Sequence, residues 1–290
     1  MHCCAANDVM RFCYQVATPD VAINENVTAL QGSIEETFGA AARSGYDGVE
    51  LMTLSPSALD RAAISRTAQD LGICIDLVCT GEVYGQLGLS FTDPDPSIRT
   101  DAICHVQEII QFAAFFGAKI NIGRVRGQYR GDIPRQQTEE WAIDAFRQIS
   151  DYAAPLGVPI ALETVTIMQT NFINTLAQAR DILRRVDREN FRLMMDIFHL
   201  NIEEPDLFKA IQMFSADNIH VHLSDNNRRY PGNCGMDFAR VIRTFHDCGY
   251  DGSFCVEVYQ MPDIETALRH SASCLAPIFE DVYGRPANRL

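Results

Sequence analysis

Short apolar runs alternate with longer segments of helical period along the whole chain. Eight strand-like runs occupy residues 9–16, 48–52, 73–79, 119–123, 159–165, 191–197, 219–223 and 253–259. Segments with apolar positions at helical spacing follow them at residues 34–44, 58–71, 97–116, 139–154, 175–186, 205–214, 236–248 and 264–279. Strict alternation of strands and helices predicts a parallel sheet covered by helices.

The segments that connect helices to strands help to distinguish a closed barrel from an open sheet. Residues 44–48 (Ser-Gly-Tyr-Asp-Gly) and 248–252 (Cys-Gly-Tyr-Asp-Gly) are near copies, which is typical of a repeated βα unit. An open doubly wound sheet usually carries a glycine-rich phosphate loop after its first strand. Here the first run leads into residues 17–20 (Ala-Thr-Pro-Asp) instead. We therefore predict an α/β fold, a (β/α)8 TIM barrel that forms one catalytic domain over residues 1–290.

Composition excludes several classes of function. A chain of 290 residues suits one barrel of ~250 residues, and no run approaches the ~18–20 apolar residues that span a bilayer. The formal charge of −14 opposes binding to a phosphate backbone, so we expect neither a nucleic-acid nor a membrane partner. Residues 1–4 do not resemble a signal peptide, and the cysteines form no CxxC pair. These features favour a cytoplasmic location.

Four of the apolar runs carry a residue that can bind a metal ion within two positions of their C-terminal end. These residues are Glu163, Asp196, His222 and Glu257, separated by 33, 26 and 35 residues. In a barrel they fall at the C-terminal ends of four consecutive strands, where TIM barrels carry their chemistry. Three converging carboxylates would repel one another without a cation. We predict that these residues bind one divalent metal ion. Mn²⁺ is the preferred ion, and Mg²⁺ and Co²⁺ are the alternatives.

Other polar residues in the strands are weaker candidates. His220 lies two residues before His222 and faces the same side of its strand, but it is farther from the rim, so we expect a core histidine. Glu50 lies near the end of the second run and is either a pocket residue or a structural ion-pair partner. Cys79 ends the third run and is a candidate for substrate contact. The irregular segment 80–96 that follows is either a lid or an ordinary surface loop.

At these residues the chain resembles the xylose-isomerase-like sugar isomerase and epimerase superfamily, and most closely the ketose 3-epimerases of the D-tagatose and D-psicose group. The resemblance is carried by residues 195–204 (Met-Asp-Ile-Phe-His-Leu-Asn-Ile-Glu-Glu), by 222–228 (His-Leu-Ser-Asp-Asn-Asn-Arg), and by 231–232 (Pro-Gly). It implies metal ligation by the four strand-end residues, an acid–base pair, and substrate contacts. The resemblance implies that Glu163 and Glu257 form the acid–base pair and that His199 and Arg228 contact the substrate.

Two features depart from that pattern. Gln169 stands where the family has a glutamate that contacts the terminal hydroxyls of the substrate. Residues 123–130 (Gly-Arg-Val-Arg-Gly-Gln-Tyr-Arg) place three arginines after the fourth run, and guanidinium groups bind phosphate or carboxylate bidentately. Arg124 and Arg126 are therefore candidates for binding an anionic sugar, although arginines here could equally pair with surface acids or form a subunit contact.

The resemblance implies a metal-dependent epimerisation at C3 of a ketose through a cis-enediolate. A ketose–aldose isomerase of the hydroxypyruvate isomerase type and an inosose-type dehydratase share that chemistry and remain alternatives. An endonuclease IV-like enzyme needs further histidine ligands, but Cys79 and Asn121 stand at those strand positions. A sugar-binding barrel without turnover is the remaining alternative. By analogy with relatives we expect a homodimer or homotetramer.

Overall fold

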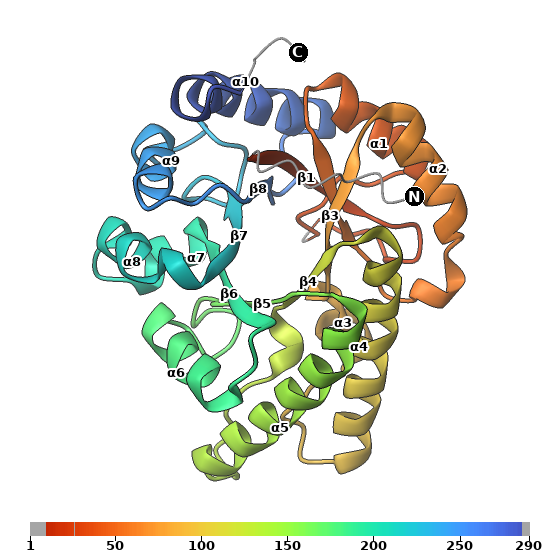
Figure 1. Cartoon of the computed structure of the whole chain (residues 1–290), viewed down its shortest axis with the longest axis vertical. Coiled ribbons are helices and arrows are strands. Elements are labelled where there is room, and N and C mark those ends of the chain that lie inside the picture. The colour runs from red at the N-terminus through yellow and green to blue at the C-terminus, as the bar shows by residue number, and fades with distance from the viewer. Residues whose placement is uncertain (1–9, 26, 286–290) are drawn as a thin grey trace.

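The computed structural model describes residues 10–25 and 27–285, and its centre is a closed barrel of eight parallel strands. Each strand pairs with its neighbours in sequence, and β1 closes the barrel by pairing with β8 (Figure 1). The strands are β1 (Arg11–Ala17), β2 (Gly48–Met52), β3 (Cys74–Cys79), β4 (Lys119–Ile122), β5 (Ile160–Glu163), β6 (Phe191–Asp196), β7 (Asn218–Leu223) and β8 (Ser253–Val256). This confirms the predicted TIM barrel.

Helices surround the barrel on its outside (Figure 1). They are α1 (Ile34–Arg43), α2 (Arg61–Leu71), α3 (Gly81–Leu87), α4 (Pro96–Phe116), α5 (Arg135–Ala153), α6 (Leu176–Val186), α7 (Ile197–Glu203), α8 (Leu207–Phe214), α9 (Phe238–Asp247) and α10 (Ile264–Tyr283). Four short 3₁₀ turns, η1 (Pro56–Ala58), η2 (Arg124–Arg126), η3 (Ala154–Leu156) and η4 (Ser215–Asp217), lie between them. None of the helices in this part of the chain is long and apolar enough to cross a bilayer.

All eight predicted strands and all eight predicted helices are present, with ends shifted by a few residues. Val9, predicted to begin the first strand, and the N-terminal residues used to exclude a signal peptide lie outside the described residues. The pattern missed α3 and α7. Helix α3 occupies part of the segment predicted to be irregular, and α7 starts directly after β6, where the pattern extended the strand to Ile197.

Alternation along the strands gives the barrel two different faces. Outward side chains pack against the helices; Phe12 and Phe254, for example, both contact the ring of Phe279 on α10 at centroid distances of 5.0 and 5.2 Å. TIM-barrel interiors are usually filled by bulky branched aliphatic side chains. Here fully or almost fully buried polar side chains occupy much of the interior, and these include Gln15, Glu50, Asp76, Asn121 and His220.

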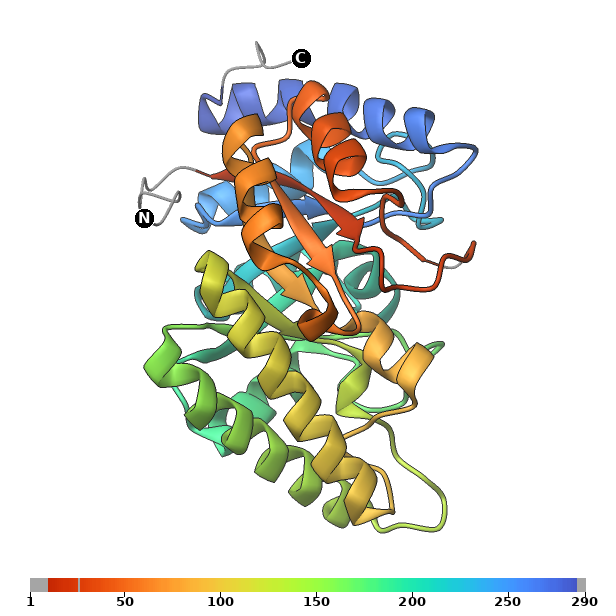
Figure 2. The ribbon, with the colours of Figure 1, turned by 90° about the vertical axis from the view of Figure 1, so that its right-hand side faces the viewer.

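The strands all point to the same end of the barrel, where the loops that follow them gather. Figure 2 shows the short helix α3 and the loop after β1 at this end. Asp196 lies at the last position of β6 and its carboxylate accepts hydrogen bonds from the backbone N–H groups of Phe198 and His199, at 2.8 and 3.4 Å. Such N-capping fixes the start of α7 and brings His199 to the mouth of the barrel.

Candidate metal centre and substrate pocket

The ends of β5 to β8 bring the four predicted metal ligands together. One ligand atom from each of Glu163, Asp196, His222 and Glu257 lies within 4.8 Å of the others, and all four residues are buried. Asp196 and His222 are register partners on β6 and β7. The Nδ1 atom of His222 lies 2.5 Å from Glu257 Oε2, 3.6 Å from Asp196 Oδ2 and 3.7 Å from Glu163 Oε1.

The chemistry of this cluster fits a divalent cation. The Nδ1 atom of His222 is buried and faces three carboxylates, whereas its Nε2 atom lies 2.8 Å from Glu50 Oε2. Burial disfavours a charged ring, but the carboxylates of Glu50 and Glu257 overcome this and raise the pKa of His222 well above its ordinary value. The cluster therefore attracts positive charge, and three carboxylate oxygens with one imidazole suit Mn²⁺, Mg²⁺ or Co²⁺.

Arg228 supplies positive charge beside two of the ligands. Its Nη1 and Nη2 atoms lie 2.5 Å from Asp196 Oδ2 and 2.5 Å from Glu257 Oε2. Burial opposes ionisation of both acids, but the guanidinium group outweighs it and holds the pKa of Asp196 well below the usual range. Arg228 has a φ of 61° in the tight turn after β7, and this turn directs its side chain back over the cluster.

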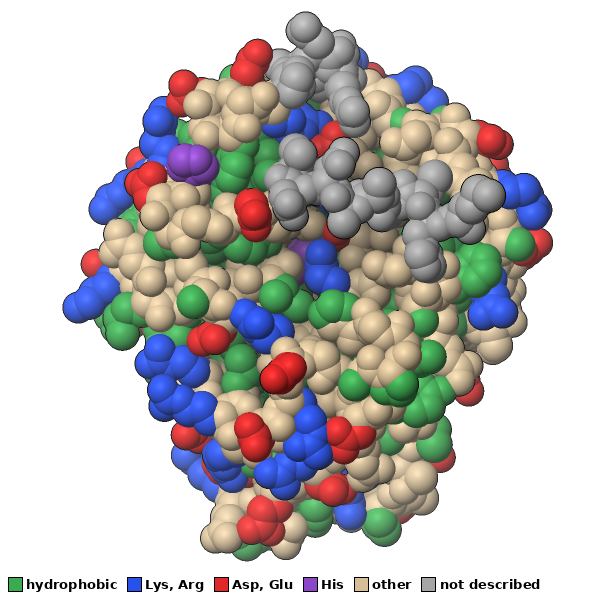
Figure 3. Space-filling view, viewed as in Figure 1, with side chains coloured by type: hydrophobic (Ala, Val, Ile, Leu, Met, Phe, Trp, Pro, Cys, Tyr) green, Lys and Arg blue, Asp and Glu red, His purple; other side chains and the backbone are tan. Residues whose placement is uncertain are grey.

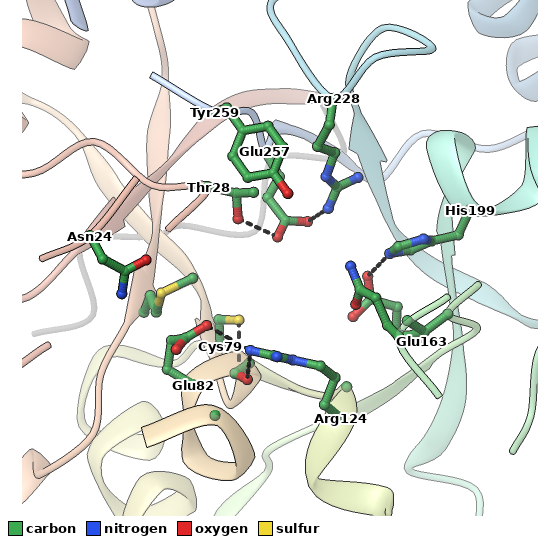
Figure 4. Close-up of a pocket in the computed structure, with 16 residues that line it drawn as sticks. Asn24, Thr28, Cys79, Glu82, Arg124, Glu163, His199, Arg228, Glu257 and Tyr259 are labelled. Carbon is green, nitrogen blue, oxygen red and sulfur yellow. Dashed lines mark hydrogen bonds and ion pairs between the residues drawn. The ribbon is translucent and has the colours of Figure 1, made fainter. Parts of the chain in front are cut away.

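A pocket of about 350 Å³ opens directly above the cluster. Figure 4 shows Glu163, Glu257, His199 and Arg228 around one part of it, with Cys79, Glu82 and Arg124 opposite. Gln169 also lines the pocket, so of the predicted substrate-binding residues His199, Arg228, Gln169, Cys79 and Arg124 lie on its wall. Burial raises the pKa of the Cys79 thiol well above its ordinary value, so Cys79 can contact a substrate but is a poor nucleophile.

The sequence did not reveal several other wall residues. Thr28, in the loop after β1, donates a hydrogen bond to Glu257 Oε1 at 2.7 Å. Asn24, Met52, Glu82 and Tyr259 also line the pocket. None belongs to a motif. Met52 ends β2, and the others depend on how the segments after β1, β3 and β8 fold over the barrel mouth.

Arg124 lines the pocket, but its guanidinium group forms an ion pair with Glu82. Its Nη2 atom lies 2.7 Å from Glu82 Oε1 and 3.0 Å from the carbonyl oxygen of Gly81 on α3. A Cβ atom at Gly85 would lie 3.0 Å from Arg124 Nη2, so the absence of a side chain there lets the guanidinium lie against the helix. The pairing leaves this arginine less available for a substrate anion.

Arg126 does not lie on the pocket wall, and the prediction that it binds substrate was wrong. It is fully buried, and burial lowers its pKa to about 10. Its guanidinium group donates hydrogen bonds to four backbone carbonyls, those of Gly123, Glu163, Phe172 and Ile173. Arg126 therefore links the loop after β4 to the loop after β5 through hydrogen bonds. One of these bonds is to the backbone carbonyl of Glu163, the predicted catalytic glutamate.

Arg126→Met is expected to lower the free energy of unfolding by about 2–5 kcal/mol, because it leaves several buried carbonyls without donors. Urea denaturation followed by circular dichroism measures the change. Arg130→Met in the same loop is the matched control; its side chain is 47% exposed and its pairing with Asp132 is loose, at 3.5 Å. The control should change stability by less than about 0.5 kcal/mol. Equal effects of the two substitutions would contradict the assignment.

The two weaker strand candidates lie beneath the pocket. His220 is fully buried in the barrel, as expected for a core histidine. Glu50 is also fully buried and is not part of the pocket wall; its Oε2 atom lies 3.0 Å from His220 Nε2 and 2.8 Å from His222 Nε2. Glu50 is thus a buried structural partner of His222, a candidate metal ligand.

Residues 38–278 match the family described as "Xylose isomerase-like TIM barrel". The chain belongs to this family. This confirms the resemblance that the motifs after β6 and β7 indicated. The same two motifs provide Asp196, His199, His222 and Arg228, which meet at the barrel mouth.

Among proteins of known activity, this member of the family is similar to L-ribulose 3-epimerase from Methylomonas sp. (strain DH-1). The two are 27% identical over 256 residues, which cover 85% of each chain. It is also 26% identical over 239 residues to 3-dehydro-D-guloside 4-epimerase of Escherichia coli (strain K12), covering 79% of this chain and 88% of the relative. Both relatives are epimerases and therefore isomerases, which supports the predicted enzyme class.

The solved structure of D-psicose 3-epimerase with D-tagatose from Clostridium cellulolyticum H10 has the same fold. It superposes with a TM-score of 0.80 at 20% sequence identity, covering 94% of this chain and 99% of the other. At this identity the superposition supports the fold of the family barrel rather than its substrate.

Proposed function

We propose that this protein is a divalent-metal-dependent sugar epimerase that inverts C3 of a ketose. The observation that carries the proposal is the placement of Glu163 and Glu257. Glu163 ends β5 and Glu257 directly follows β8, two strands separated by β6 and β7, and both residues line the pocket above one ligand cluster. Two carboxylates that reach one point from different sides can act on opposite faces of a planar intermediate.

In this mechanism one glutamate removes the proton from C3 and the other delivers a proton to the opposite face of the enediolate. The centre is thereby inverted without any net redox change. His199 lies 3.9 Å from Glu163 Oε1 and 3.8 Å from Asp196 Oδ2, and with Arg228 it is placed to hold the oxygens at C1 and C2. A cation held by Glu163, Asp196, His222 and Glu257 would supply Lewis-acid polarisation of the carbonyl group.

The charges around the pocket favour a neutral sugar. Glu82, Glu163 and Glu257 on the wall and Asp196 below it carry four negative charges, while Arg124 and Arg228 carry two positive charges. With His222 neutral, a divalent cation would balance the two negative charges that remain. Because Arg126 is buried and Arg124 is paired, the support for a phosphate or carboxylate substrate is weaker than the loop sequence suggested.

A panel of C3 to C6 ketoses, keto acids and their phosphates in deuterated water, supplemented with Mn²⁺, tests this proposal. We expect neutral ketoses to exchange the proton at C3 and to give the C3 epimer. Phosphorylated and carboxylated analogues are expected to react at least about tenfold more slowly, because a buried anion without a partner costs more than the ~1.4 kcal/mol that this factor represents.

The same panel separates the alternatives. Exchange between C1 and C2 would identify a ketose–aldose isomerase, inversion at C4 would match the activity named for the Escherichia coli relative, and loss of water would identify a dehydratase. Metal uptake or sugar binding without any exchange would favour a binding barrel. Faster turnover of a phosphate or keto acid would overturn the neutral-substrate proposal.

We propose Mn²⁺ as the native ion, one catalytic domain over residues 1–290, a homodimer or homotetramer, and a cytoplasmic location. An endonuclease IV-like activity is disfavoured because Cys79, the last residue of β3, and Asn121, the last but one of β4, occupy positions where further histidine ligands would be needed. Asn121 instead donates a hydrogen bond to Glu163 Oε2 at 3.3 Å.

A further inference from the structure

A continuous row of buried polar side chains leads from the ligand cluster through the inside of the barrel. His222 Nε2 lies 2.8 Å from Glu50 Oε2, which lies 3.0 Å from His220 Nε2. His220 Nδ1 lies 3.3 Å from Asp76 Oδ2. The side chains of these four residues are at most 1% exposed.

Two cations close the row at the opposite end of the barrel. Lys119 Nζ lies 2.8 Å from Asp76 Oδ2 and Arg11 Nη1 lies 3.0 Å from Asp76 Oδ1. Both are the first residues of their strands, so they lie at the end of the barrel away from the pocket. Figure 3 views that end, and basic and histidine side chains are visible near its centre. Burying ionised groups is costly unless each is paired, and every member of this row has a polar or charged neighbour within 3.3 Å.

Ligation of a metal ion by His222 would require one particular tautomer of its ring. A ring nitrogen that binds a metal carries no proton, so ligation through Nδ1 requires the ring proton to be on Nε2. Nε2 lies 2.8 Å from Glu50 Oε2, which can accept that proton in a hydrogen bond. Metal-binding histidines generally depend on such a partner for both tautomer and ring orientation.

Glu50 is itself held from two sides. Its Oε1 atom accepts a hydrogen bond from Gln15 Nε2 at 2.7 Å, and its Oε2 atom contacts His220 as well as His222. Gln15 Oε1 lies 3.1 Å from the hydroxyl of Thr28, and the same hydroxyl contacts Glu257. The carboxylate of Glu50 therefore cannot rotate without disturbing hydrogen bonds that lead to two of the metal ligands.

We propose that Glu50 is a positioning residue that fixes the tautomer and orientation of His222, and that His220 and Asp76 hold Glu50 in place. This inference rests on the metal site of the proposed function. A second metal ion is the competing explanation for these contacts, because ligand atoms of Glu50, His220, His222 and Cys255 also lie within 4.8 Å of one another. A second metal ion there would replace the hydrogen bonds, so the number of ions bound per chain separates the two.

The test measures Mn²⁺ affinity of the full chain by competition with a chromophoric chelator, after metal removal. Glu50→Gln keeps the size of the side chain but removes its charge. It is expected to raise the Mn²⁺ dissociation constant by about 10- to 100-fold, the usual effect of losing such a partner. Its kcat at saturating Mn²⁺ should fall much less, because excess metal refills the site.

Asp47→Asn provides the matched control. Asp47 forms a partly buried ion pair with Arg285, with Oδ2 2.8 Å from Arg285 Nε, and it is not part of the ligand cluster or the pocket wall. This variant should melt at a lower temperature while keeping the wild-type Mn²⁺ affinity. Equal losses of affinity in Asp47→Asn and Glu50→Gln would show a general effect of destabilisation and overturn the proposal.

Unchanged Mn²⁺ affinity in a folded Glu50→Gln variant would also overturn the proposal. So would the finding that the wild-type chain binds two ions and that Cys255→Ser loses one of them. If Glu50→Gln does not fold, His220→Gln is measured in its place. This variant is expected to raise the Mn²⁺ dissociation constant by a smaller factor, and an unchanged constant would contradict the proposal. Wild-type chain that binds Mn²⁺ but turns over no ketose would remove the proposed function and leave the role of Glu50 intact. Wild-type chain that binds no divalent ion would overturn both.

Discussion

Glu163→Gln and Glu257→Gln are each expected to lower the rate of C3 epimerisation by about 10²- to 10⁴-fold at saturating Mn²⁺, the usual contribution of a general acid or base. The amide keeps an oxygen that can contact the cation but cannot accept the proton from carbon. Both side chains line the pocket and face the same cluster, so neither can replace the other on its own face of the intermediate.

Proton NMR in deuterated water measures the effect. Because each glutamate serves one face, residual exchange in the two variants should be confined to opposite epimers of the substrate. Glu140→Gln, an exposed residue hydrogen bonded to Gln136, is the control and should retain wild-type rates. Full epimerisation by both pocket variants, with folding confirmed by circular dichroism, would contradict their roles as the acid–base pair.

Removal of divalent metal is expected to abolish turnover, because the site then lacks the Lewis acid that would polarise the substrate carbonyl. Readdition of Mn²⁺ should restore it, with Co²⁺ and Mg²⁺ as the next best ions. Mn²⁺ at 100 times its dissociation constant should also stabilise the fold by about 2.7 kcal/mol, which corresponds to a rise of several degrees in melting temperature.

Asp196→Asn separates a bound cation from a general salt effect. It removes one carboxylate of the ligand set while its neighbours on β5, β7 and β8 remain. The melting temperature of this variant should respond little to Mn²⁺ at concentrations that stabilise the wild-type chain. Turnover by chain shown to be metal-free by elemental analysis would contradict the metal dependence.

The ligand cluster was predictable because two simple regularities determine it. Side chains alternate along a strand, and parallel strands of a barrel end at the same rim. A carboxylate or imidazole at the last inward position of consecutive strands must therefore approach its neighbours, as Glu163, Asp196, His222 and Glu257 do. The motifs after β6 and β7 added His199 and Arg228, since short fixed spacings keep these residues beside the ligands.

The two loop arginines were not predictable in the same way. Arg124 and Arg126 belong to one short 3₁₀ turn, η2, in which residues two apart point in different directions. One lies on the pocket wall beside Glu82, and the other is buried among carbonyls of the neighbouring loop. Their sequence context is almost identical, so only the packing of the loops after β3, β4 and β5 distinguishes them.

The sequence by itself determined the barrel, the four ligand-type residues at its rim and the family motifs, because each depends on local periodicity and on one shared direction of the strands. Tertiary structure alone decided which arginine reaches the pocket, which residues of the loops after β1 and β3 complete its wall, and how Glu50 connects His222 to Asp76. Those contacts join residues far apart in the chain through side-chain packing and hydrogen bonds, and no local pattern encodes them.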